Sequence, residues 1–219
     1  KFNADNIGTI IETIPANNSV KAKVIAIALS HPLGVGNSYF RIGSNKIREV
    51  DTVPFGCYKK EVFENIGLYD EELIRNQDDE LNGRLTQSGG KIILISNIAL
   101  KYYARDTIKK VFNMFYQYGF YKPLVYRKLK KPATVRQFAP LFFVLGILTG
   151  LLTGLFNHLI LKMTFFCICF YFFTMLIISL KIIMNRKLKF ISISYFLITF
   201  FIINWSYGWG YINGISTLL

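Results

Sequence analysis

The chain has 219 residues, of which 52% are hydrophobic and 16% aromatic, and its 26 Lys and Arg against 13 Asp and Glu give a formal net charge of +13. This aromatic content excludes an intrinsically disordered chain. Three cysteines are too few for a disulfide-rich secreted scaffold. Residues 1–106 hold all 13 acids and 13 bases, whereas residues 107–219 hold the other 13 bases and no acid. The two parts therefore have different surroundings, and the apolar excess points to a membrane protein.

The first part, residues 1–106, has the pattern of an α/β domain. In chain order, the pattern first predicts a strand within residues 5–13, a helix over residues 19–29 capped by Asn18 or Ser19, and a turn-rich loop over residues 31–36. A strand over residues 50–55 and a short helix over residues 58–66, which Gly67 stops, come next. A helix that ends at Gly89 and Gly90 and a buried strand over residues 91–96 complete this part. β-Branched residues leave a strand possible for residues 19–29. So few strands imply a longer protein, as does the opening at Lys1 without a signal peptide.

Three consecutive acids, Asp78, Asp79 and Glu80, follow Gln77 at the start of the helix that ends at Gly89. One interpretation is structural, because Asn76 can cap the helix and acids in the first turn favour the positive end of the helix dipole. The other is functional. Neighbouring carboxylates repel one another and raise at least one pKa, and a carboxylate tuned in this way can act as a general base. The residues alone leave both interpretations open.

The segment over residues 107–137 has a different pattern. Apolar side chains recur at helical spacing from Ile108 to Phe120, with Lys109 and Lys110 on another face. This pattern predicts an amphipathic helix. The basic cluster over residues 127–131 and the apolar run that follows favour a position in the plane of the lipid headgroups. Packing against a partner helix or a core is the alternative.

Residues 138–219 contain three apolar runs, over residues 138–156, 163–184 and 190–205. A spanning helix needs about 20 mainly apolar residues. The first two runs qualify, and the third does so only if it continues to Trp209, so we expect two to three spans. The aromatic and glycine-rich residues 205–211 predict an interfacial aromatic belt with a bend.

Positive charge predicts the orientation of these spans. Basic residues gather before the first run and between the second and third runs, over residues 122–136 and 186–189, which belong on the cytoplasmic side. We therefore expect a multi-pass protein of the inner cell membrane, with everything before residue 137 in the cytoplasm. The three apolar runs contain no Asp or Glu, which argues against an ion transporter. Because the bases lie beside the spans, we expect membrane lipids rather than nucleic acid as their partner.

Several motifs resemble the acceptor half of family 2 glycosyltransferases of the GT-A type, most closely the membrane-attached succinoglycan or exopolysaccharide subgroup. The motifs are Ser30–Asn37 (SHPLGVGN), Pro54–Phe63 (PFGCYKKEVF), Ile66–Glu72 (IGLYDEE), Asn76–Leu85 (NQDDELNGRL), Lys101–Arg105 (KYYAR) and Ser206–Gly210 (SYGWG). The resemblance covers nearly the whole chain. It implies that residues 1–106 are the acceptor half of a GT-A-like domain, and that the donor-binding half lies outside this sequence.

The resemblance also implies roles for individual residues. Asp78 takes the place of the family's catalytic base, and Gln77 takes the place of the Glu before it. Asp79, Glu80 and Arg84 support the site, with Glu80 and Arg84 on recurring positions of the motif. The resemblance implies that Asp78 deprotonates a hydroxyl of an acceptor sugar, whose oxygen attacks a nucleotide sugar with inversion.

Four further residues are candidates for acceptor binding. Gly56 would let the backbone approach a sugar. Phe55 and Tyr58 could stack on its face, with core packing as the alternative. Arg75, like Arg84 and Arg105, could face a diphosphate, with a surface ion pair as the alternative. Arg105 is the candidate diphosphate contact in the motif at residues 101–105.

Two departures from the family pattern limit these implications. The motif that holds Mg²⁺ or Mn²⁺ against the diphosphate would lie before Lys1, so we expect no metal ligands in this chain and no turnover by the chain alone. The segment Gln117–Tyr121 (QYGFY) lacks the Arg and Trp of processive members, so we expect transfer of single hexose-type sugars. The expected partners are a nucleotide-sugar donor and a lipid-linked saccharide acceptor. A non-catalytic scaffold subunit of a polysaccharide export complex is the alternative.

Overall fold

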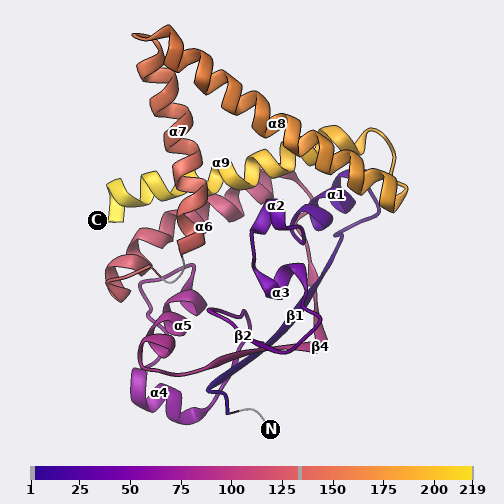
Figure 1. Cartoon of the computed structure of the whole chain (residues 1–219). Coiled ribbons are helices and arrows are strands. Elements are labelled where there is room, and N and C mark those ends of the chain that lie inside the picture. Colours follow the sequence, from indigo (N-terminus) through magenta and orange to yellow (C-terminus); the bar gives the residue numbers. More distant parts are fainter. Residues whose placement is uncertain (1–2, 133–134, 219) are drawn as a thin grey trace.

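The computed structural model describes residues 3–132 and 135–218. A small sheet with short helices forms one end of the molecule, and long helices form the other (Figure 1). The mixed α/β character expected of residues 1–106 is confirmed, with a small sheet and mostly helices.

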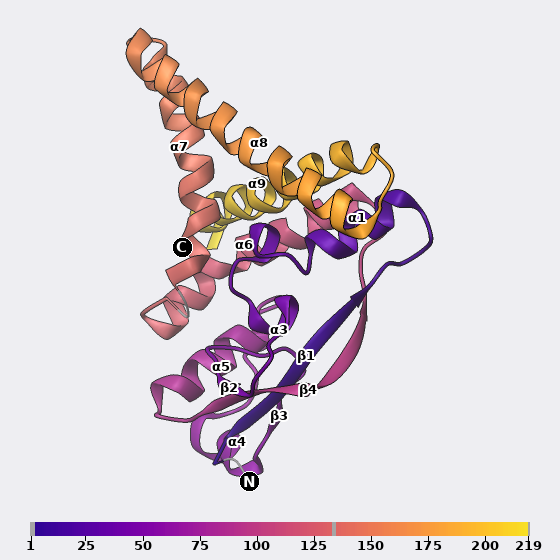
Figure 2. The same cartoon turned by 45° about the vertical axis from the view of Figure 1, so that its right-hand side comes forward.

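The sheet has four strands in the order β2-β4-β1-β3. Its two long strands, β1 (Asn6–Ile14) and β4 (Ile92–Tyr103), run parallel, with a shift in register between Thr9 and Ile10. The outer strands β2 (Arg48–Glu49) and β3 (Cys57–Tyr58) are antiparallel to their neighbours. Figure 2 shows β1 and β4 side by side along most of their length.

The helices predicted in the first part are confirmed. They are α1 (Val20–Ala28), α4 (Lys60–Ile66) and α5 (Gln77–Gln87). The hydroxyl of Ser19 accepts a hydrogen bond from the N–H of Ala22 and so caps α1. Gly67 ends α4 at a φ of 82°, a conformation that favours glycine.

Two local predictions in this part are wrong. Residues 50–55 form no strand, although the N–H of Val50 donates to the carbonyl of Ile92 at 3.0 Å. The chain turns at Pro54 and Phe55, where Phe55 adopts a φ of 53°. The expected loop over residues 31–36 contains the short helix α2 (Pro32–Val35), which His31 caps by accepting from the N–H of Leu33. A second short helix, α3 (Tyr39–Ile42), follows it.

The second part of the chain forms the helices α6 (Ile108–Leu129), η1 (Val135–Phe138), α7 (Ala139–Gly154), α8 (His158–Arg186) and α9 (Ser192–Leu218). Within the described residues, two helical segments are long and apolar enough to cross a membrane, Val135–Gly154 and His158–Arg186. They correspond to the first two predicted spans and form a hairpin that points away from the sheet (Figure 1). The third predicted run lies inside α9.

The helices α6 and α9 lie side by side between the sheet and the α7–α8 hairpin (Figures 1 and 2). The apolar face of α6, which includes Val111, Met114 and Phe115, is buried in one core with Phe196 and Phe200 of α9. The alternative of a partner helix is therefore the arrangement found. The position of α6 relative to the lipid headgroups stays a prediction.

The helix α9 continues without a break through residues 205–211, where the sequence predicted a bend. Its glycines permit close packing instead. A Cβ at Gly208 would collide with the carbonyl of Pro140 in α7, and a Cβ at Gly210 would collide with the carbonyl of Tyr116 in α6. Small residues let helix backbones approach one another at such crossings.

Candidate active site

The candidate base, Asp78, lies in the first turn of α5. Its side chain is half-buried, whereas that of Gln77 beside it is exposed. The Oδ1 atom of Asp78 accepts a hydrogen bond from the N–H of Asp79 at 3.0 Å. The carboxylate is therefore held in place and still reaches the surface.

The surroundings of Asp78 disfavour its charged form. Burial is the main cause that raises the pKa of Asp78 to about 6, and repulsion from Asp79 adds to it. Lys122 of α6 opposes this shift. The side chain of Lys122 is only 7% exposed and forms an ion pair with Asp79. The neighbouring acids therefore differ, because Asp79 has a cationic partner whereas burial disfavours the charge of Asp78.

The residues before α5 fasten its start to α6. Asn76 lies at the N-cap position of α5, but the predicted cap by its side chain is wrong, because its φ is 63° and its side chain makes no capping hydrogen bond. The three acids do lie in the first turn of the helix, as the structural interpretation expected. The Nδ2 atom of Asn76 donates instead to the carbonyl of Tyr118 in α6 at 2.8 Å. The Nε atom of Arg75 donates to Oε1 of Gln117 at 2.9 Å. These contacts place Asp78 at the seam between α5 and α6.

Glu80 and Arg84 form a structural pair. Glu80 is 3% exposed, and its Oε1 atom accepts from Nε of Arg84 at 2.7 Å. The same guanidinium donates to the backbone carbonyls of Ile66 and Leu68 after α4. Arg84 therefore neutralises a buried carboxylate and ties the loop after α4 to α5.

The side chain of Asn82 hydrogen-bonds α5 to the sheet, a role that the sequence did not predict. Its buried side chain accepts from Nδ2 of Asn6 and from the hydroxyl of Tyr58, both at 2.8 Å. It donates to the hydroxyl of Thr52 at 2.9 Å and to the carbonyl of Val53 at 3.2 Å. Asn82 thus joins α5 to β1 and β3. Its partners are distant in sequence, so no local pattern reveals this role.

The predicted acceptor-binding residues differ in their surroundings. Phe55 is 72% exposed, so core packing does not explain it. Tyr58 is half-buried, and the centre of its ring lies 5.4 Å from that of Phe63. Burial is the main cause that raises the pKa of Tyr58, and the charge of Asp78 contributes to this shift. A Cβ at Gly56 would collide with the side chain of Asn6, so this glycine makes room for Asn6.

Arg105, the candidate diphosphate contact, is exposed between β4 and α6. Among the described residues, no group of three or more His, Cys, Asp or Glu could hold a metal ion. The Mg²⁺ or Mn²⁺ motif was expected before Lys1, so the divalent cation stays a prediction. The structure brings together Asp78, Asp79 and Tyr58 with Lys122, which the sequence had placed only in a basic cluster.

Comparison with known proteins shows the class of protein to which the chain belongs. The chain is 31% identical over 150 residues, 68% of its length, to the dolichyl N-acetyl-alpha-D-glucosaminyl phosphate 3-beta-D-2,3-diacetamido-2,3-dideoxy-beta-D-glucuronosyltransferase of Methanococcus voltae. It is 28% identical over 138 residues, 63% of its length, to the succinoglycan biosynthesis protein ExoA of Rhizobium meliloti (strain 1021). The chain is thus a family 2 glycosyltransferase-like protein, as its motifs predicted.

The matches cover 45% and 41% of these two relatives, so the chain spans less than half of their length. No family model matches the chain, and no solved structure matches it. The likeness therefore concerns the class of protein, and the activity of the whole protein is a matter for proposal.

Proposed function

We propose that this chain supplies the acceptor side of an inverting glycosyltransferase, in which Asp78 is the general base. The observation that carries the proposal is the half-buried carboxylate of Asp78, whose pKa is raised to about 6 in a motif that resembles the family's catalytic position. A base whose pKa lies near the working pH is largely deprotonated and is also basic enough to take a proton from a hydroxyl.

In the proposed reaction, the Asp78 carboxylate takes the proton from an acceptor hydroxyl. The oxygen then forms a bond to the anomeric carbon of the donor sugar, the bond from that carbon to the diphosphate breaks, and the configuration inverts. Lys122 forms an ion pair with Asp79 and balances its charge beside the base. The exposed ring of Phe55 offers a face on which an acceptor sugar can stack. A Mg²⁺ or Mn²⁺ ion from outside this chain would stabilise the departing diphosphate.

We propose a nucleotide sugar as the donor and a lipid-linked saccharide as the acceptor, used in the synthesis of a surface glycan or exopolysaccharide. The names of the two relatives support this choice, because one refers to a dolichyl phosphate-linked sugar and the other to succinoglycan biosynthesis. The α7–α8 hairpin supports attachment to a membrane, where a lipid-linked acceptor resides. The sheet and α5 then belong on the cytoplasmic side, by the distribution of basic residues.

The test is the Asp78→Asn substitution in the full-length protein, assayed in membranes with radiolabelled nucleotide sugars. We expect near-complete loss of transfer with normal expression and membrane insertion, because Asn cannot accept the proton. The matched control is Glu71→Gln, which removes an exposed acid of the loop before α5 and should leave transfer unchanged. Transfer retained by Asp78→Asn would remove Asp78 as the base.

A further inference from the structure

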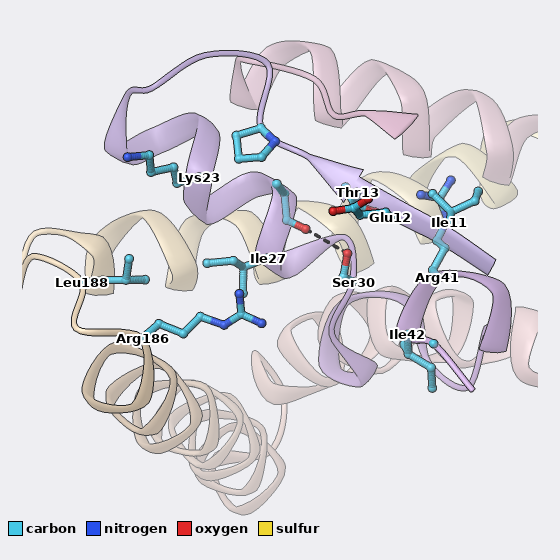
Figure 3. Close-up of a pocket in the computed structure, with 13 residues that line it drawn as sticks. Ile11, Glu12, Thr13, Lys23, Ile27, Ser30, Arg41, Ile42, Arg186 and Leu188 are labelled. Carbon is cyan, nitrogen blue, oxygen red and sulfur yellow. Dashed lines mark hydrogen bonds between the residues drawn. The ribbon is translucent and has the colours of Figure 1, made fainter. Parts of the chain in front are cut away.

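A pocket of about 530 Å³ lies at the end of β1 farthest from its pairing with Tyr58. It is open to solvent and is lined by residues of β1, α1 and α3 and by the last residue of α8 (Figure 3). Asp78 does not line it. The candidate active site therefore leaves this pocket unexplained.

Two polar atoms of the pocket lining are buried and find no hydrogen-bond partner among the described residues. They are Nη1 of Arg41 and Oγ1 of Thr13. The guanidinium of Arg41 is fixed over the rings of Tyr102 at 5.2 Å and Phe40 at 5.6 Å. Because neither atom is accessible, a group in the pocket cannot reach them, and only the accessible part of the half-buried Arg41 side chain can contact a ligand.

The charge of the pocket lining favours an anionic ligand. Its lining includes Lys23, Arg41 and Arg186 against a single carboxylate, Glu12. Figure 3 shows Arg41 rising from α3 beside Thr13, with Arg186 reaching in from α8. Arginine binds phosphate with short, charge-assisted hydrogen bonds. A phosphate group therefore fits the positive charge of the lining.

The position of the pocket favours a membrane lipid as the source of that phosphate. Arg186 is the last residue of α8, which is long and apolar enough to cross a membrane, and such a helix ends at the depth of the headgroups. Apolar side chains of Ile27, Ile42 and Leu188 complete the lining and suit the glycerol and acyl region of a lipid. We propose that this pocket binds the phosphate of an anionic phospholipid through Arg41 and Arg186. The proposal does not depend on the transferase activity.

The test uses the purified full chain in detergent micelles, titrated with phosphatidylglycerol or phosphatidylcholine. Native mass spectrometry counts the bound lipids, and the midpoint of thermal unfolding follows stabilisation. We expect phosphatidylglycerol to bind more tightly than phosphatidylcholine. Arg41→Gln and Arg186→Gln should each weaken phosphatidylglycerol binding about fivefold, the change that corresponds to about 1 kcal/mol per cation at a membrane surface.

Two further variants keep the test decisive. Glu12→Gln removes the one carboxylate of the lining and should strengthen phosphatidylglycerol binding, a gain that misfolding cannot produce. Lys189→Gln removes an exposed cation just after α8 that does not line the pocket, and it should change binding little. Equal weakening by Lys189→Gln and Arg41→Gln would mean diffuse surface attraction and would overturn the pocket. If inorganic pyrophosphate stabilised the chain through Arg41 while phosphatidylglycerol did not, the lipid source would be overturned.

Discussion

The substitution Asp78→Asn is expected to stabilise the fold while it abolishes the proposed chemistry. Burial and Asp79 raise the pKa of Asp78 from 3.8 to about 6. That is roughly 2 pKa units, and at 1.36 kcal/mol per unit the charged carboxylate costs about 3 kcal/mol of folding free energy above pH 7. This figure is an upper bound, because water screens part of the repulsion at a half-buried side chain. Asn keeps an Oδ1 acceptor for the N–H of Asp79.

The pH dependence follows from the sign of the shift. The folded state holds the proton of Asp78 more tightly than the unfolded chain, so this group's contribution to stability is complete below pH 3.8 and is lost as the pH rises through about 6. Asn has no proton to lose. The unfolding midpoint of Asp78→Asn should therefore exceed that of the wild type by up to about 6 °C above pH 7, at about 2 °C per kcal/mol, and by less as the pH falls.

The assay is thermal unfolding in detergent, followed by far-UV circular dichroism at a series of pH values. Glu71→Gln, which removes an exposed acid of the same region, is the control and should shift the midpoint little at any pH. A lower midpoint for Asp78→Asn than for the wild type at pH 8 would refute the reasoning. It would mean that the carboxylate stabilises the fold, as a structural helix-start acid does.

Three other changes test the arrangement around this site. Lys122→Met removes the cation that lowers the pKa of Asp78, so the acid limb of the pH–rate profile of the full-length enzyme should move above pH 6. Arg84→Ala leaves the Glu80 carboxylate, which is 3% exposed, without its partner. The expected loss is about 3–5 kcal/mol of unfolding free energy, measured in denaturant titrations. Gly210→Val forces a side chain against the α6 backbone. The free energy of unfolding should fall by about 1–3 kcal/mol or more, and the unfolding midpoint should fall with it.

Each of these changes has a control or a contrary outcome. An acid limb that stays in place in Lys122→Met would show that the cation does not tune the base. Adding Glu80→Gln to Arg84→Ala removes the unpaired charge and should recover part of the stability. Gly146→Val is the control for Gly210→Val, because a Cβ at Gly146 meets nothing within 4 Å. Equal losses in the two valine variants would argue against close packing at Gly210.

The elements that the sequence predicted correctly carry their signals locally. The helix α1 begins at Ser19, whose hydroxyl caps it, and α4 ends at Gly67 in a conformation that suits glycine. The two apolar helices α7 and α8 follow from length and composition alone. These features depend on neighbours within one or two turns, so a single sequence contains them.

The features that the sequence could not predict depend on distant partners. Val53 lies in the wrongly predicted strand, and it is fully buried where a Cβ on Gly8 of β1 would collide with it. Its burial comes from tertiary packing, which local β-propensity cannot separate from a strand. Asn82 bonds to Asn6, 76 residues away, so its role depends on the completed fold.

The helix α6 links the candidate base to the long apolar helices. On one side, it contributes the carbonyl of Tyr118 to Asn76 and the ammonium of Lys122 to Asp79. On another side, its backbone packs at Gly119 against the carbonyl of Tyr207 in α9. One core also joins α1 and α6 with α8 and α9. The sheet is thus fastened to the apolar helices by packing as well as by the chain, so a change at the α6–α9 contact can displace Lys122. For this reason Gly210→Val should disturb the pH–rate profile along with stability, although the glycine does not touch Asp78.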